Sequence, residues 1–131
     1  MQRTLEFLRK ANTFYLATVD GDQPRVRPFG AVAEFDGKLY ISTNNTKYCF
    51  KQMVANSKVE ISGMVEGEWI RLNSEVKSDD RLEAKQAMLD ANPALENLYK
   101  VDDEVFEVLY FTKATAIFSS FTTAPETEVV A

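Results

Sequence analysis

The chain has 131 residues, of which 45% are hydrophobic and 27% charged, the balance of a globular domain with a sizeable core. Its net charge of −5 argues against general nucleic-acid binding, which needs a clustered surplus of Lys and Arg. With no histidine and one cysteine, Cys49, the sequence excludes a disulfide framework, Ser-His-Asp or Cys-His catalysis and a cysteine-histidine metal site. No apolar run is long enough to span a bilayer and the N-terminus lacks a signal-peptide pattern, so we expect one cytoplasmic domain over residues 1–131.

The first half of the chain predicts one helix and three strands: a helix in 4–11, then strands in 13–19, 25–35 and 38–43. The dipeptides Asp20-Gly21 and Asp36-Gly37 separate the strands and are strong hairpin signals. Each apolar run is therefore expected to pair with the next one along the chain.

The second half predicts further helices and strands: a helix in 46–56, two strands in 58–78, a helix in 79–91, a short helix after Asn92, and one or two strands in 105–121. Ser78 is expected to cap the helix at 79–91. The tail, residues 122–131, is expected to be loosely ordered. About six strands joined mainly by hairpins indicate a mainly β, α+β fold: an antiparallel barrel with helices packed on it.

Two arginines are candidates for ligand contact. Arg25 and Arg27 lie two residues apart on a predicted strand, so their side chains share one face. The alternative is a pair of solvated charges on an exposed face. Flanking Pro24 and Pro28 and the nearby Gly30 favour a shaped backbone that approaches a ligand closely.

The stretch STNNTK, residues 42–47, joins a predicted strand to a predicted helix. Its hydroxyls, its lysine and the free N–H groups of a helix start are suitable donors for a phosphate. The alternative is that Asn45 or Thr46 only caps the helix. The glycines of a Walker loop are missing.

Trp69 and Arg71 share one face of a later predicted strand. Packing in a core or an interface is the common role of a strand tryptophan, and stacking on a planar ligand is the alternative. Cys49 lies near a predicted helix start, where a reactive thiol is one interpretation, but a buried structural cysteine is the simpler one.

Together these segments resemble the pyridoxamine 5′-phosphate oxidase-like family of FMN-binding split β-barrels, over roughly residues 3–121. The arginine strand, followed by ISTNNTK and then NSKVEI, carries the most specific part of the resemblance. The segments GEWIRLNSEV, DDRLEAKQAMLDANP and FEVLYFTKATAIFSSF are similar to those of small single-domain members. The resemblance implies a six-stranded antiparallel split β-barrel with flanking helices, and a homodimer with FMN bound at the subunit interface.

The resemblance also implies which residues bind FMN. The second strand would supply Arg27 and backbone contacts at Pro28, Phe29 and Gly30. The phosphate and ribityl chain would be held by Ser42, Thr43, Asn44, Thr46 and Lys47. Trp69 and Arg71 would reach the flavin bound mainly by the partner chain. In this arrangement Arg27 and Lys47 neutralise the phosphate, and backbone amides near Gly30 approach the isoalloxazine.

The sequence also departs from known members of this family. Vitamin B6 oxidases hold their substrate with a C-terminal Arg and His, whereas this chain ends in TTAPETEVVA and has no histidine. Vitamin B6 oxidation is therefore not expected, and the histidine associated with some nitroimidazole-resistance relatives is absent too. The leading hypothesis is an FMN-dependent oxidoreductase of unknown substrate. Alternatives are a non-catalytic flavin-binding protein (electron carrier or flavin store), a binder of deazaflavin F420 or haem, and a cofactor-free dimeric barrel.

Overall fold

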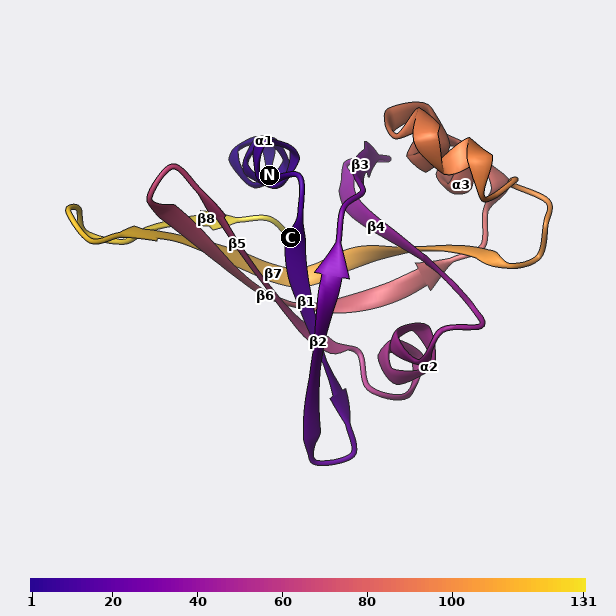
Figure 1. Ribbon diagram of the computed structural model, residues 1–131, viewed down its shortest axis with the longest axis horizontal. Helices are drawn as coiled ribbons and strands as arrows, with labels where there is room; N and C mark the ends of the chain where they lie inside the picture. The colour runs from indigo at the N-terminus through magenta and orange to yellow at the C-terminus, as the bar shows by residue number, and fades with distance from the viewer.

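The computed structural model describes all 131 residues, and its strands form one antiparallel sheet with the helices packed around it (Figure 1). In chain order the elements are α1 (Gln2–Ala11), β1 (Phe14–Asp20), β2 (Gln23–Phe29), β3 (Val32–Phe35), β4 (Lys38–Asn44), α2 (Tyr48–Ala55), β5 (Lys58–Val65), β6 (Glu68–Asp79), α3 (Leu82–Ala91), the 3₁₀ helix η1 (Pro93–Asn97), β7 (Phe106–Ser120) and β8 (Glu126–Val129). The order of strands in the sheet is β2-β1-β5-β6-β7-β4-β3, and β8 pairs with β7. None of the helices combines the length and the apolar character needed to cross a membrane.

The predicted mainly β antiparallel fold with flanking helices is confirmed, but the structure has eight strands rather than six. One added strand arises because the extended run at 25–35 divides at Gly30 and Ala31. There the chain leaves its pairing with β1 and, as β3, begins to pair with β4. The predicted hairpin at Asp36-Gly37 is confirmed, with φ of +53° and +70° at its two central residues, as a two-residue hairpin of this twist requires.

The tail after Phe121, predicted to be loosely ordered, instead contains β8, which pairs with residues 115–118 of β7. The polar sequence of this segment does not indicate a strand, because the interactions that stabilise the strand come from distant parts of the chain. The Glu128 carboxylate accepts hydrogen bonds from the Thr4 amide at 2.9 Å and the Thr4 hydroxyl at 2.6 Å. Beyond β8, the Val130 amide donates to the Ala114 carbonyl at 2.8 Å.

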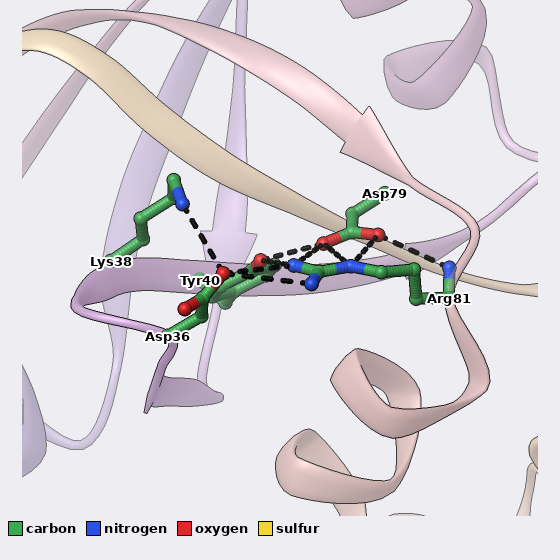
Figure 2. A network of polar contacts seen from close by, with 5 residues as sticks. All are labelled: Asp36, Lys38, Tyr40, Asp79 and Arg81. Atoms are coloured by element: carbon green, nitrogen blue, oxygen red, sulfur yellow. Dashed lines mark hydrogen bonds and ion pairs between the residues drawn. The ribbon is translucent and has the colours of Figure 1, made fainter.

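The start of α3 also differs from the prediction. Strand β6 continues through Asp79, and the helix begins at Leu82 with Arg81 as its N-cap residue, so Ser78 does not cap it. Figure 2 shows the reason: the buried Asp79 carboxylate lies between the Tyr40 hydroxyl, which donates at 2.6 Å, and the Arg81 guanidinium, which donates at 2.9 Å. These bonds fix the end of β6 against β4 and set where α3 starts.

The polar network around Asp79 shifts two pKa values. Hydrogen bonding from Arg81 outweighs burial and lowers the pKa of Asp79 to about 2, with a further contribution from the Tyr40 hydroxyl. Burial, reinforced by the hydrogen bond to Asp79, raises the pKa of Tyr40 to about 12. The network is therefore ionised at Asp79 and neutral at Tyr40 across the physiological pH range.

Two apolar clusters stabilise the fold. The larger has 19 buried residues and joins α1, through Leu5 and Leu8, to the inner face of the sheet, including Phe14, Ile61 and Phe118. The smaller has 7 buried residues and seats α3 against β3, β4 and β7, with Met88, Leu89, Tyr40 and Phe106 among them. The second cluster matters for function, because it positions α3 and η1 beside the ends of β2 and β4.

Candidate functional site

Two neighbouring cavities lie along β2 and α2. We call the larger the Arg27 cavity; it has a volume of about 930 Å³ and is lined by residues of β1, β2 and α2, among them Asp20, Arg25, Arg27, Tyr48, Lys51 and Gln52. We call the other the Gly30 cavity; it has a volume of about 550 Å³ and is lined by Pro28, Phe29, Gly30, Ser42, Thr43 and Lys47, and by residues of the α3–η1 segment. Arg27 and Pro28 are adjacent in the chain, as are Lys47 and Tyr48, and each cavity takes one member of each pair.

The Gly30 cavity brings together residues from the ends of β2 and β4 that the sequence predicted as one site. The pairing of β3 with β4 explains this proximity, because Val32 lies opposite Ile41. Gly30, just before β3, is therefore placed next to Ser42 and Thr43, just after Ile41.

The start of α2 borders the Gly30 cavity through Lys47, and its first turn has no side-chain cap. The alternative interpretation, that Asn45 or Thr46 caps the helix, is wrong: Lys47 is the N-cap residue, and the Thr46 hydroxyl donates to the Asn44 side chain at 2.6 Å. The Asn45 amide group is also committed elsewhere, to the Glu104 carbonyl at 2.8 Å. The first N–H groups of α2 are consequently left without a side-chain acceptor, next to the positive end of the helix dipole.

Asn44, predicted to contact a ligand, has its side chain occupied within the chain. Its Oδ1 accepts from the amide and hydroxyl of Thr46, and its Nδ2 donates to the Tyr99 hydroxyl at 2.7 Å. Asn44 is buried, whereas Thr46 is exposed and does not line either cavity. The amide therefore shapes the turn before Lys47 and ties that turn to Tyr99 in the cavity wall.

The α3–η1 segment forms a wall of the Gly30 cavity that the sequence did not indicate. Asn92 fixes the segment by donating from Nδ2 to the Val32 carbonyl at 2.9 Å. Leu95, Leu98 and Tyr99 then line the cavity. The Asn92-Pro93 helix boundary was visible in the sequence, but nothing local shows that it faces β2 and β4.

The charges lining the two cavities are mostly positive, although the chain as a whole carries −5. Lys47 is the only charged residue lining the Gly30 cavity, and it forms no ion pair. Lys47 and Tyr99 are the titratable groups of that lining. A single unpaired ammonium beside an uncapped helix start and two hydroxyls fits an anionic group such as a phosphate.

Arg27 does not share a cavity with Lys47. Its guanidinium points toward Thr18 and Gln52, donating to the Thr18 hydroxyl at 2.7 Å and to the side-chain oxygen Oε1 of Gln52 at 2.9 Å. Arg25 lines the same Arg27 cavity, in agreement with the predicted common face of the two arginines. Thr18 and Gln52 were not singled out in the sequence, because their role depends on α2 packing against β1.

Trp69 and Arg71 lie outside both cavities, on β6. The Trp69 ring packs against Phe121, with centroids 5.0 Å apart, and Arg71 donates from Nε to Glu60 at 3.0 Å. Hydrogen bonding to Glu60 raises the pKa of Arg71. Within one chain these two residues do not approach the Gly30 cavity.

Cys49 is buried in α2, and its Sγ lies 3.4 Å from the Thr43 hydroxyl. This placement agrees with a structural cysteine that packs between α2 and the end of β4. The thiol does not line either cavity.

Comparison with known proteins gives the family context. A sequence model of the family described as pyridoxamine 5′-phosphate oxidase matches residues 1–110. No curated protein matches the chain significantly. Among solved structures, a NimC/NimA family protein from Clostridium acetobutylicum is 59% identical, with a TM-score of 0.93, and the match covers 98% of this chain and 93% of that one.

Two more distant structures show the same fold. A haem-binding protein from Mycobacterium smegmatis is 14% identical with a TM-score of 0.70, covering 93% of this chain and 56% of that one. An FAD-binding protein from Mesorhizobium loti is 17% identical with a TM-score of 0.62, covering 91% of this chain and 94% of that one. Proteins of this architecture thus carry different prosthetic groups.

Proposed function

Because the chain belongs to the pyridoxamine 5′-phosphate oxidase family, we propose that it is an FMN-binding oxidoreductase whose flavin occupies the Gly30 cavity. The observation that carries the proposal is the convergence of Gly30, Ser42, Thr43 and Lys47 on one cavity beside the uncapped start of α2. A flavin, when bound, supplies the transfer of electrons or hydride. The chain supplies binding, orientation and charge.

Different residues of the Gly30 cavity would contact different parts of the flavin. Lys47, the first N–H groups of α2 and the hydroxyls of Ser42 and Thr43 would hold the phosphate and the ribityl chain. The backbone from Pro28 to Gly30 would lie along the isoalloxazine, and the absence of a side chain at Gly30 leaves that approach open. Leu95 and Leu98 would shield the ring from water on the side of η1.

The exposed face of the sheet supports a homodimer as part of the proposal. Residues paired directly across antiparallel strands share a face, so Tyr15, Ser62 and Arg71 lie in one row and Met64 and Trp69 in another. Tyr15 is 51% exposed and Met64 61% exposed, so large apolar side chains on this face have no partner within the chain. A second copy on this face would cover them and bring Trp69 and Arg71 into the interface.

The visible spectrum of the purified protein, together with its flavin stoichiometry after reconstitution with FMN, tests the proposal. We expect a yellow protein with one FMN per chain that NAD(P)H reduces and a quinone or nitroaromatic compound reoxidises. A colourless protein that does not take up FMN would contradict the flavin site, and a haem spectrum would assign another cofactor. Lys47 and Tyr99, which line the Gly30 cavity, are compatible with a flavin carrier as well as with an enzyme. Stable binding without turnover would therefore identify a carrier or flavin store.

A further inference from the structure

The negative charge of the chain is concentrated in one segment, residues 79–107. This segment contains nine of the 20 carboxylates and three of the 15 cations, a net charge of −6. The remaining 11 carboxylates and 12 cations give the rest of the chain a net charge of +1. The segment consists mainly of α3, η1 and the loop before β7, which lie together at one side of the sheet (Figure 1). That side of the molecule is therefore strongly acidic.

Most of these carboxylates have no partner within the chain. Those that are exposed and form no ion pair are Asp80, Glu83, Asp90, Glu96, Asp102 and Glu104. Asp79, by contrast, is buried and pairs with Arg81. Unpaired charges of one sign on one surface produce a potential that attracts a partner of the opposite charge and speeds its association.

An apolar groove lies within this acidic surface, along α3 and the end of β3. Its volume is about 450 Å³, and its apolar lining consists of Phe35, Leu82, Ala87 and Val101. Leu82 is 53% exposed, so much of its side chain has no apolar partner within the chain. The groove thus offers apolar surface that a partner would remove from water.

The polar residues of the groove are Glu83, Gln86 and Asp90, all on α3. Because residues three and four apart are neighbours on a helix, these three form a row beside the apolar lining. Gln86 donates from Nε2 to the Asp90 carboxylate at 2.8 Å, so both charges in the lining are negative and no cation neutralises them.

We propose that this groove, the α3 groove, docks a partner protein through a basic amphipathic segment. Apolar side chains of the segment would pack against Phe35, Leu82 and Val101, and its lysines or arginines would lie near Glu83 and Asp90. An amphipathic helix laid in an apolar groove is a common mode of recognition, and the flanking charges select a basic partner. A second copy of this chain is less complementary, because outside residues 79–107 its charge is nearly balanced.

The proposal does not depend on the flavin. The α3 groove shares no residue with the Gly30 cavity or the Arg27 cavity. Its small size predicts a transient complex, with a dissociation constant on the order of 10–100 μM. Binding should be equal in the flavin-free and the FMN-loaded protein.

Titration of the full chain with synthetic peptides, followed by ¹⁵N NMR, tests the proposal. The probe is a helical peptide with leucine on one face and lysine on the other. One comparison peptide has glutamate in place of lysine, and another has serine in place of leucine. We expect the Leu/Lys peptide alone to bind, more weakly as salt rises, and to shift the amide signals of Phe35, Leu82, Ala87 and Val101.

Two variants separate the apolar and the charged contributions. Leu82→Ser should weaken binding of the Leu/Lys peptide about five- to tenfold. The double variant Glu83→Gln, Asp90→Asn should weaken it about three- to tenfold at low salt and reduce its salt dependence. Each variant changes exposed side chains only, and the double variant tests the groove even if Leu82→Ser fails to fold.

Each variant has a matched control outside the groove. Val54→Ser removes an aliphatic side chain of α2 that is 64% exposed, and Glu6→Gln removes an exposed, unpaired carboxylate of α1. Both controls should bind the Leu/Lys peptide as wild type does.

Four results would overturn the proposal. One is no binding of the Leu/Lys peptide, and another is equal binding of the Ser/Lys peptide, which would assign a nonspecific attraction to negative charge. A third is unchanged affinity in Leu82→Ser, or shifted signals that lie away from the groove. The fourth is a change of oligomeric state in Leu82→Ser, measured by sedimentation, which would identify the groove as a contact between copies of the chain. Failure of FMN binding would refute the proposed function and leave this test valid.

Discussion

Replacement of Tyr40 by Phe removes one hydroxyl from the network in Figure 2 and leaves the packing of the ring intact. Tyr40 is 1% exposed and donates to the buried Asp79 carboxylate at 2.6 Å. Hydrogen bonds to charged groups contribute about 1.5–3 kcal/mol. Asp79 retains three hydrogen bonds of 2.9–3.1 Å from Arg81, so the loss should fall in the lower part of this range, at about 1.5–2 kcal/mol.

The pH dependence gives this prediction a specific signature. The pKa of Tyr40 is about 12 against an ordinary value of 10.0, so the stability it contributes is complete below pH 10 and is lost as the pH rises toward 12. Two pKa units correspond to about 2–3 kcal/mol. The pKa of Asp79 is about 2 against an ordinary value of 3.8, so its contribution is complete above pH 3.8 and is lost as the pH falls toward 2. Wild type and Tyr40→Phe should therefore differ most at neutral pH and converge above pH 10.

Urea unfolding at a series of pH values measures both effects. Tyr110→Phe is the matched control, because Tyr110 packs against Tyr40 with ring centroids 5.6 Å apart but its hydroxyl makes no hydrogen bond in the structure. That control should change the free energy of unfolding by less than about 0.5 kcal/mol. Equal stabilities of wild type and Tyr40→Phe at neutral pH, or a constant difference up to pH 12, would refute the reasoning.

Two further predictions concern the tail and the cavity wall. Burial by itself raises the pKa of Glu128, but hydrogen bonds from Thr4 and the N-terminal ammonium outweigh it and lower the pKa from 4.5 to about 2. The stability from Glu128 is present above pH 4.5 and should be lost as the pH falls toward 2, by up to about 3 kcal/mol, whereas Glu128→Gln should lack this slope in acid unfolding curves. Tyr99→Phe removes the acceptor of the Asn44 amide and should weaken FMN binding three- to tenfold, or about 1 kcal/mol, in a fluorescence titration. An unchanged Kd would show that the turn before Lys47 keeps its shape without Tyr99.

The sequence predicted those parts of the fold that depend on local signals. The hairpin at Asp36-Gly37 and the amphipathic helix α1 follow from neighbouring residues, and both are present. Strand β8 could not be predicted, because its polar residues become a strand only through pairing with β7 and the contact of Glu128 with Thr4. The start of α3 was misplaced for a similar reason, since Asp79 accepts hydrogen bonds from Tyr40, 39 residues away, and from Arg81, and these keep it at the end of β6.

In the candidate site, too, the features set by local sequence signals were predictable and those set by distant contacts were not. The proximity of Gly30 to Ser42, Thr43 and Lys47 follows from one hairpin, and the sequence predicted it. The direction of the Arg27 guanidinium was not predictable, because it depends on the packing of Gln52 on α2 against β1. The contribution of Leu95 and Tyr99 to the cavity wall was not predictable either, since η1 is placed at the cavity by α3 and its apolar cluster.

The most direct test of the central claim is the affinity of Lys47→Ala for FMN, measured by titration against wild type and against Lys77→Ala, a control that removes an exposed lysine outside both cavities. Lys47 is the only cation lining the Gly30 cavity and has no ion pair, so the charge it offers to a phosphate has no substitute. Loss of one charge-assisted contact costs about 1.5–3 kcal/mol, which predicts binding weaker by about ten- to a hundredfold. Unchanged affinity in Lys47→Ala, with wild type binding one FMN per chain, would contradict the placement of the flavin phosphate in this cavity.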